Sequence, residues 1–342
     1  MTDFYNKKSN KNIKTILLNI FSPLYSLSQK HISISNHRKK YNGKTICVCG
    51  FTKRSNNKTD ICIELYDYLK KYRKQYDICF IKQQSLRTKY REIIIPKYCD
   101  QLFSYREIGY DAKLLSNYAD TFLVKNINNI NYSNKNYDYI IFDDYFLTKN
   151  SKLNKNIVVF DEKSFIGNGY YFPAGPVITN LKKLKNADFA IIVNNTLEKN
   201  MDRKMREVEI LTNYISIEKI LYAELVIKNV SRKKTNTKYF AFSCIDDDFE
   251  HIIKHCNMNI VGFHKILSKK RQKYSKDNIY RPQLFVNMIN HLDGNDKIKL
   301  ITSKKDYEMI PNYLIDKFNI EYLQTEYKIE KVDLIFDFNT LK

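Results

Sequence analysis

Residues 44–75 read KTICVCGFTKRSNNKTDICIELYDYLKKYRKQ, and this stretch decides the fold. Its first eight residues form an apolar run typical of a buried strand, and from residue 59 onward apolar side chains recur at helical spacing. A strand, a loop ending in Lys58-Thr59 and a helix follow one another as in a phosphate-binding loop, whose consensus is G-x-x-x-x-G-K-[ST]. Only Lys58-Thr59 keeps to that consensus. The stretch alone is therefore compatible with a nucleotide site or with a turn rich in Lys and Asn.

Further apolar runs alternate with helical or polar segments, and this alternation predicts a doubly wound, mostly parallel α/β sheet. A polar, basic stretch at residues 228–238 (KNVSRKKTNTK) is predicted to be a linker to a second, smaller α/β unit. We expect an N-terminal helix within 1–40, a main domain over 41–230 and a smaller domain over 231–342. The predicted strands are 76–82, 120–125, 137–144, 156–161 and 187–195, then 238–245, 259–267, 297–306 and 332–338, with a helix at 248–256.

The chain is strongly basic, with 58 Lys and Arg against 37 Asp and Glu and a formal net charge of +21. Such a surface attracts nucleic acid, anionic lipid or phosphorylated substrates. The basic residues are dispersed, and the sequence has no arginine-rich arm, zinc-finger spacing or recognisable RNA- or DNA-binding module. A nucleic-acid-binding function therefore rests on charge and scattered tyrosines alone, and a solvated basic surface is the simpler interpretation.

Seven cysteines, an odd number, lie mostly inside apolar runs, which favours buried thiols in a reducing cytosol over a disulfide framework. His251, His255, Cys256 and His264 suggest a metal site by their proximity in the sequence. Their helical surroundings and the neighbouring Lys254 favour ordinary helix residues instead.

The segment at residues 15–27 (TILLNIFSPLYSL) is apolar, but it is too short to span a bilayer and Pro23 interrupts it. Lys14 and Lys30 flank it, as in an interfacial anchor that places aromatic and basic residues at the level of the lipid headgroups. A helix packed on its own domain fits the pattern equally well. No cleavable signal peptide is evident.

Two carboxylates, Asp143 and Asp144, follow the apolar strand of YDYIIFDDYF. A carboxylate at the carboxyl end of a buried strand is the Walker-B arrangement, which holds Mg²⁺ directly or through water. Aspartates also start turns at the ends of strands, so the pair by itself leaves both interpretations open.

Residues 165–176 read FIGNGYYFPAGP and hold three of the eight glycines and two of the six prolines. A chain that uses glycine so sparingly is expected to keep it where positive φ or a close backbone approach is needed. This density favours a constrained functional loop over a structural double turn.

With the following LKKLKNADFAIIVNN (residues 181–195), this loop resembles the tetraacyldisaccharide 4'-kinases, the lipid A 4'-kinases of Gram-negative bacteria. Their signature runs F-G-N-G, then P-A-G-P, then an L-K-x-A-D strand. The resemblance extends along nearly the whole chain, from SPLYSL in the N-terminal segment through the Asp143-Asp144 pair to ITSKKD (residues 301–306). It implies a P-loop kinase fold with an amphipathic N-terminal helix.

The resemblance implies transfer of the γ-phosphate of ATP to the 4'-hydroxyl of a lipid disaccharide 1-phosphate. It also implies a monomer without nucleic-acid partners, bound peripherally to the anionic cytoplasmic face of the inner membrane. Lys58 is expected to contact the β- and γ-phosphates, and Thr59, Asp143 and Asp144 to hold Mg²⁺. The nucleotide-binding residues expected from the family's T-x-G-G-N-G-K-T loop are Thr52, Asn56, Asn57, Lys58 and Thr59.

Several family positions differ in this chain. Arg54, Ser55 and Asn57 replace glycines, and Asn57 is expected to adopt the left-handed conformation at a cost of about 1 kcal/mol. The catalytic Asp of the family's G-D-E motif aligns with Tyr110, so Asp111 is the nearest carboxylate able to act as the base. Further changes fall at residues 145–148, 178–179 and 269–271. The sequence thus leaves two hypotheses, an active divergent kinase with Asp111 as base and a degenerate homologue that retains only nucleotide or lipid binding.

Overall fold

The structure is a computed structural model. It describes Leu18 and residues 42–52, 57–83, 92–99, 102–103, 105–124, 135–144, 154–195, 201–228, 237–244, 248–256, 258–266, 280, 282–290 and 298–336. The predicted N-terminal helix (apart from Leu18), the loop residues 53–56 and residues 229–236 of the predicted linker lie outside this part of the chain. No described helix is long and apolar enough to cross a lipid bilayer.

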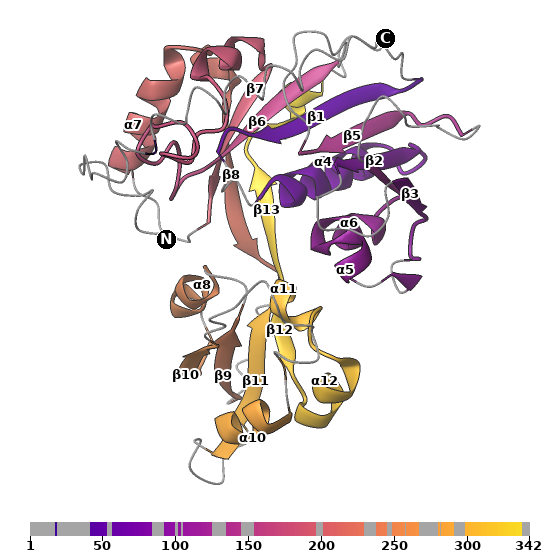
Figure 1. The fold of residues 1–342 in the computed structure, drawn as a ribbon, viewed down its shortest axis with the longest axis vertical. Coiled ribbons are helices and arrows are strands. Elements are labelled where there is room, and N and C mark those ends of the chain that lie inside the picture. Colours follow the sequence, from indigo (N-terminus) through magenta and orange to yellow (C-terminus); the bar gives the residue numbers. More distant parts are fainter. Residues whose placement is uncertain are drawn as a thin grey trace. The chain divides into compact units, whose positions relative to one another are not determined.

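The described residues form two compact units. The first unit contains those up to 194, from 201 to 223 and from 327 onward, and the second contains Asn195 and those from 224 to 326. The predicted domains, 41–230 and 231–342, were drawn as continuous stretches, whereas both observed units are discontinuous. The chain returns to the first unit after completing the second (Figure 1).

A nine-stranded sheet organises the first unit, in the order β13-β8-β7-β6-β1-β5-β2-β4-β3. Its strands are β1 (Lys44–Gly50), β2 (Ile78–Gln83), β3 (Glu92–Ile95), β4 (Thr121–Val124), β5 (Tyr139–Asp143), β6 (Lys155–Asp161), β7 (Phe189–Asn194), β8 (Ile220–Ile227) and β13 (Thr325–Ile329). β1 pairs in parallel with β5 on one side and β6 on the other. At one edge of the sheet β3 is antiparallel to β4, and at the other edge β13 is antiparallel to β8, since the amides of Lys228 and Glu330 donate to the carbonyls of Gln324 and Tyr222. The mostly parallel α/β fold predicted from the sequence is confirmed.

The central strand β1 is buried on both faces, which explains its unbroken apolar sequence. Ile46 and Val48 belong to the core on one face of the sheet, and Cys47 and Cys49 belong to the core on the other. The two cysteines alternate with branched residues because successive side chains of a strand point to opposite faces. All seven cysteines are free thiols.

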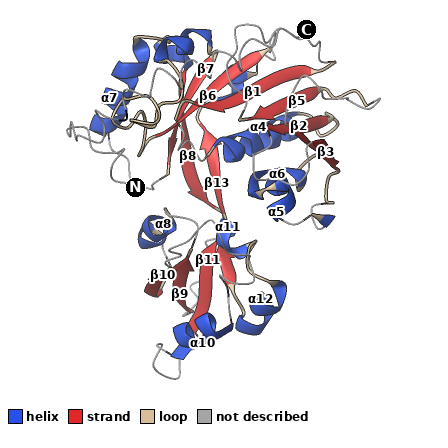
Figure 2. Cartoon of the chain, viewed as in Figure 1, coloured by secondary structure: helices blue, strands red, loops and turns tan. Residues whose placement is uncertain are grey.

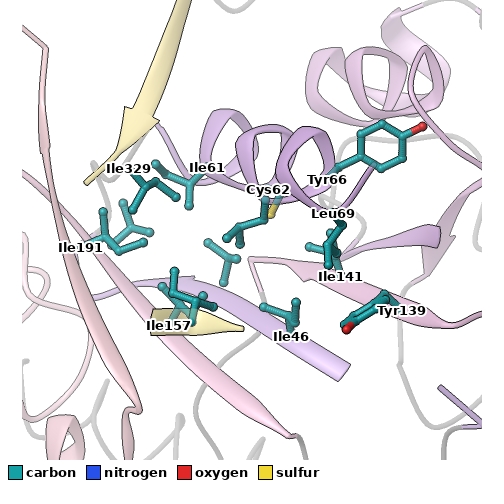
Figure 3. Close-up of a cluster of buried hydrophobic side chains, with 14 of the residues drawn as sticks. Ile46, Ile61, Cys62, Tyr66, Leu69, Tyr139, Ile141, Ile157, Ile191 and Ile329 are labelled. Atoms are coloured by element: carbon teal, nitrogen blue, oxygen red, sulfur yellow. The ribbon is translucent and has the colours of Figure 1, made fainter. Parts of the chain in front are cut away.

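Helix α4 (Lys58–Tyr72) covers the first of these faces. Its buried residues Ile61, Cys62, Leu65 and Leu69 recur at helical spacing and form one apolar stripe. Figure 3 shows this stripe facing isoleucines of β1, β5 and β6. Close packing in this core fixes the start of α4 beside the end of β1.

The opposite face is covered by helix α7 (Met201–Thr212) and the 3₁₀ helix η3 (Leu181–Asn186), with a further 3₁₀ turn, η4 (Ile217–Lys219), beyond α7 (Figure 2). Leu184 of η3 and Leu211 of α7 are buried in the hydrophobic core that also contains Cys47. Two short helices, α5 (Tyr105–Ile108) and α6 (Tyr110–Ser116), lie between β3 and β4 in the chain.

The segment at residues 332–338 was predicted as a strand of the second domain, and that prediction is wrong. Val332–Ile335 forms a 3₁₀ helix, η5, and Ile335 and Phe336 enter the core of the first unit. The ring of Phe336 stacks on Tyr68 of α4 at a centroid distance of 5.3 Å. Consecutive burial of Ile335 and Phe336 next to an exposed Leu334 departs from the two-residue alternation of a half-buried strand.

The second unit is built on a parallel four-stranded sheet in the order β10-β9-β11-β12. Its strands are β9 (Lys238–Ser243), β10 (Ile260–Lys265), β11 (Ile298–Ser303) and β12 (Glu321–Leu323), and its helices are α8 (Phe249–His255), α10 (Pro282–Asn290), α11 (Lys304–Tyr307) and α12 (Asn312–Phe318). The strand predicted at 297–306 ends at Ser303, whose hydroxyl accepts a hydrogen bond from the Asp306 amide and so starts α11.

A fully buried carboxylate, Asp306, lies at the centre of the second unit. It accepts hydrogen bonds from the hydroxyls of Ser243 (2.8 Å), Tyr280 (2.5 Å) and Ser303 (3.0 Å) and from the Cys244 amide (3.1 Å). Burial and the adjacent carboxylate raise the pKa of Tyr280, so its phenol remains a donor. Asp306 therefore joins β9, β11 and the start of α11.

We expect Asp306→Ala to destabilise the second unit by at least about 3 kcal/mol, because each buried donor left without an acceptor costs about 1–3 kcal/mol. Urea unfolding of the full chain measures this loss. Asp306→Asn, which keeps one acceptor oxygen, should lose less. Identical unfolding midpoints for Asp306→Ala and the unmodified chain would contradict this role.

Candidate functional site

The carboxyl ends of three neighbouring strands meet at one edge of the large sheet. Asp143 of β5 pairs in register with Val48 of β1 and with Lys82 of β2. Parallel strands end at the same edge, which is where open α/β sheets bind ligands. Helix α4 begins at this edge with Lys58 and Thr59, so side chains from three strands and one helix converge there.

Asp143 is the buried centre of this cluster, with 1% of its surface exposed. The hydroxyl of Thr59 donates a hydrogen bond to its Oδ2 atom at 2.5 Å, and the ammonium of Lys82 lies 2.9 Å from the same oxygen. Its Oδ1 atom is also buried and has no hydrogen-bond partner among the described residues. Burial raises the pKa of Asp143, although Lys82 acts in the opposite direction.

Asp144 follows directly and turns the chain out of the strand. Its φ of +66° is in the left-handed region, and its amide donates to the carbonyl of Val48 at 3.0 Å. Its Oδ1 atom forms an ion pair with the Nζ atom of Lys58 at 3.1 Å. Burial opposes ionisation, but the charges of Lys58 and Lys82 prevail and lower the pKa of Asp144.

A third carboxylate, Asp111, reaches the cluster from the first turn of α6. Its Oδ2 atom lies 3.1 Å from the ammonium of Lys82, and its side chain is 47% exposed. Gly109 precedes the helix with a φ of +83°, a conformation that favours glycine. Lys82 was not identified from the sequence; the available signal was a lysine at the end of the apolar strand YDICFIK.

The glycine- and proline-rich loop at residues 165–176 leads into a segment that contacts the start of the predicted phosphate-binding loop. Thr52 forms an antiparallel bridge with Val177, and the Ile178 amide donates to the carbonyl of Phe51 at 3.1 Å. Within the loop, a Cβ atom on Gly175 would lie 2.2 Å from the carbonyl oxygen of Tyr170. Glycine is therefore required at this position, and the loop supports the backbone that leaves β1.

Asn57 occupies the N-cap position of α4 with φ −98° and ψ 12°. The predicted left-handed conformation is wrong for this residue, so the replacement of glycine brings no left-handed strain there. The amino end of a 15-residue helix carries partial positive charge and favours anions, which suits a phosphate beside Lys58.

The structure thus brings together Lys58, Thr59, Asp111, Asp143 and Asp144, all of which were predicted from the sequence, and adds Lys82. Thr52 and Asn57 flank this cluster on the two sides of the loop, where both are buried. Asn56 lies outside the described residues.

A model of the tetraacyldisaccharide-1-P 4'-kinase family, LpxK, matches residues 14–338. The chain belongs to this family. It is 32% identical over 304 residues to the tetraacyldisaccharide 4'-kinase of Rickettsia typhi, covering 85% of this chain and 84% of that protein. It is 28% identical to the Rickettsia canadensis enzyme of the same name, covering 77% of this chain and 75% of that one.

The fold is also that of a solved tetraacyldisaccharide 4'-kinase. The crystal structure of LpxK from Aquifex aeolicus in complex with ATP matches with a TM-score of 0.65 at 17% identity. The match covers 92% of this chain and 95% of that chain. This structural similarity supports the P-loop kinase fold that the family resemblance implied.

The residues of this family member fit a divalent cation that shares its ligands with a nucleotide. Within the described ranges, no group of three or more His, Cys, Asp or Glu side chains is placed to hold a metal ion by itself. His251, His255, Cys256 and His264 belong to these ranges, so they do not form such a group. Hard cations such as Mg²⁺ are instead bound by one or two carboxylates together with substrate phosphates. The Oδ1 atom of buried Asp143, which has no hydrogen-bond partner among the described residues and lies beside the Thr59 hydroxyl, fits the oxygen donor that such an ion requires.

Proposed function

We propose that this protein transfers the γ-phosphate of ATP to the 4'-hydroxyl of tetraacyldisaccharide 1-phosphate in lipid A synthesis. The observation that carries the proposal is the pairing of Lys58 with Asp144 and of Thr59 with Asp143. In the proposed function, Lys58 and Thr59 are the end of a P-loop and Asp143 and Asp144 the end of a Walker-B strand; that the chain belongs to the kinase family supports this interpretation. Both pairs are present although the loop has lost its glycines.

Lys58 and the amino end of α4 bind the β- and γ-phosphates of ATP in this proposal. The Lys58 ammonium neutralises charge on the phosphates, and its exchange from Asp144 to phosphate costs little because both partners are anionic oxygens. Thr52 and Asn57, at the two described ends of the predicted phosphate-binding loop, contribute to nucleotide binding in this proposal. Phosphoryl transfer depends on such positioning and charge neutralisation more than on covalent catalysis.

Thr59 and Asp143 would hold Mg²⁺, with Asp144 next to them. The Thr59 hydroxyl donates a hydrogen bond to Asp143 and keeps its oxygen lone pairs for a cation. When bound, the metal ion supplies positive charge against the phosphate oxygens. Asp143 and Thr59 also hold each other in place, so the protein ligands are oriented in advance.

Asp111 is the proposed general base. The bond that forms joins the 4'-oxygen of the sugar to the γ-phosphorus, and the bond that breaks joins that phosphorus to the bridging oxygen of ADP. The hydroxyl proton passes to the carboxylate of Asp111, which is half exposed and therefore accessible to a substrate. Tyr110, which aligns with the family's base, precedes it in the same helical turn.

The membrane location is part of the same proposal. A lipid substrate requires the site to lie near a bilayer, and the net charge of +21 favours an anionic surface. We assign the anchor to residues 15–27 and the location to the cytoplasmic face of the inner membrane, where the protein binds peripherally as a monomer.

Deletion of residues 15–27 is expected to release the protein from anionic liposomes, because the apolar segment supplies the buried area for interfacial binding. Sedimentation with phosphatidylglycerol vesicles measures the fraction of protein that is bound. The difference from sedimentation with neutral vesicles gives the part of the binding that depends on charge. Retention of the truncated chain at the level of the full chain would contradict the anchor.

The kinase function is tested by incubating the full chain with γ-labelled ATP, Mg²⁺ and tetraacyldisaccharide 1-phosphate. We expect label in the lipid fraction, attached at the 4'-position. If label stays out of the lipid while ATP still raises the melting temperature, the protein is the nucleotide-binding homologue without catalysis. If label is transferred to another hydroxyl, the assignment of the substrate position is wrong.

A further inference from the structure

Lys82 is a buried lysine whose ammonium lies between two carboxylates of the site. Its side chain is 10% exposed, and its Nζ atom is 2.9 Å from Asp143 and 3.1 Å from Asp111. Asp143 is a metal ligand and Asp111 is the base in the function proposed above. Lys82 is thus the described residue that directly connects the two.

We propose that Lys82 is a positioning residue that holds the Asp111 carboxylate against the metal-binding edge of the sheet. This inference rests on the proposed kinase function. Lys82 is fixed by its strand, because its backbone pairs in register with Asp143 across β2 and β5. Asp111, by contrast, belongs to a seven-residue helix and is half exposed. The buried, strand-held Lys82 therefore orients the half-exposed Asp111.

Without the Lys82 ammonium, we expect the Asp111 carboxylate to move away from Asp143 and Asp144. Asp111, Asp143 and Asp144 then face one another with Lys58 as their single cation within the cluster described here. Like charges at close range repel, and the half-exposed Asp111 can turn to water at little cost. The Asp111 carboxylate would then no longer lie beside the reacting hydroxyl, although the residue itself is unchanged.

The Lys82 ammonium also affects the affinity of the site for a divalent cation. Lys82 occupies Oδ2 of Asp143 and places a positive charge beside the cation site. Removing it makes the site more negative and leaves the Thr59 hydroxyl as the described donor to Oδ2. A variant without this charge should therefore bind a divalent cation more tightly and yet transfer phosphate more slowly. A general unfolding of the site would instead weaken cation binding and slow phosphate transfer together.

The test compares Lys82→Met, which keeps an apolar stem of similar length, with Lys82→Arg, which keeps the charge. Binding of Mn²⁺ to the nucleotide-free full chain is measured by electron paramagnetic resonance. We expect Lys82→Met to tighten Mn²⁺ binding by about tenfold or more. Its kcat should fall about 100-fold with little change in the KM for ATP. Lys82→Arg should keep Mn²⁺ binding near that of the unmodified protein and recover part of kcat.

The effect of Asp111→Asn separates positioning from charge alone. In the unmodified background this substitution should weaken Mn²⁺ binding by about fivefold, because a nearby negative charge is lost and Lys82 turns wholly to Asp143. In the Lys82→Met background it should have almost no effect, because Asp111 has already turned away. Equal effects of Asp111→Asn in the two backgrounds would overturn the inference.

Two further outcomes separate the positioning role of Lys82 from the proposed kinase function. Weaker Mn²⁺ binding in Lys82→Met, together with lower activity and a lower melting temperature, would make Lys82 a merely structural residue and overturn the inference. If the unmodified protein transfers no phosphate, the kinase proposal fails. The Mn²⁺ measurements then still decide whether Lys82 holds Asp111, because they need no turnover.

Discussion

Lys58→Ala lowers kcat/KM for phosphoryl transfer by about a thousandfold, the scale expected when one preorganised charge partner of the transition state is removed. Lys58 is the first residue of α4, and its side chain is 15% exposed, so its ammonium lies in a partly desolvated position where charge interactions are strong. Alanine cannot neutralise the β- and γ-phosphates. Labelled-phosphate transfer to the lipid substrate measures the effect.

The matched control is Lys71→Ala, which removes the same charge from the exposed carboxyl-terminal turn of the same helix. This variant should transfer phosphate at the normal rate, because a solvated charge this far along α4 is screened from the site. Nearly equal rates for Lys58→Ala and the unmodified protein would exclude the P-loop role of Lys58. A melting curve for each variant verifies that both are folded.

Asp111→Asn reduces kcat by about 10²- to 10⁴-fold, the range that a positioned general base contributes. Asparagine has nearly the same shape as aspartate but accepts no proton at neutral pH. The KM for ATP at saturating Mg²⁺ should stay the same, because Asp111 lies on α6 and its carboxylate contacts Lys82. Steady-state kinetics with both substrates separate the two parameters.

Tyr110→Phe is the control for this assignment, since Tyr110 aligns with the family's catalytic carboxylate and begins the same helix. A phenol with an ordinary pKa near 10 is a poor base at neutral pH, so its hydroxyl should be dispensable. Loss of activity in Tyr110→Phe with retention in Asp111→Asn would transfer the catalytic role to the tyrosine and refute the role of Asp111.

Much of the site could be predicted because local patterns and strand ends determine it. The strand before Gly50 and the helix after Lys58 have clear apolar periodicities, and Asp143 follows an unbroken apolar run. Once the sheet is parallel, the edge at which these segments end is the same. The approach of Lys58 to Asp144 follows from this topology and needs no detailed knowledge of the loop.

Lys82 could not be found in this way, because its role depends on which strands are neighbours. A lysine at the end of a strand normally extends into water, and only the pairing of β2 with β5 buries it against Asp143. Strands β3, β8, β12 and β13 were also missed. β3 and β12 are only four and three residues long, β8 alternates buried and partly exposed positions, and in β13 only the last residue, Ile329, is buried.

The backbone conformation of Asn57 was not predicted correctly, because tertiary contacts select it. Asn57 was expected in the left-handed region and instead has a φ of −98°. The described residue of the cluster with positive φ is Asp144, where the turn after β5 directs the carboxylate to Lys58. Aspartate tolerates this conformation better than most residues, so its cost is modest.

The close backbone approach at Gly175 limits how far a sequence of this kind can drift. The chain has given up glycine at residues 54, 55 and 57, yet at 175 a single methyl group would collide with the main chain of Tyr170. A side chain at residue 175 would therefore have to displace the Tyr170 carbonyl. Through Val177 and Ile178, such a shift would reach Phe51 and Thr52, so the backbone that leaves β1 depends on a glycine that lies far from it in the sequence.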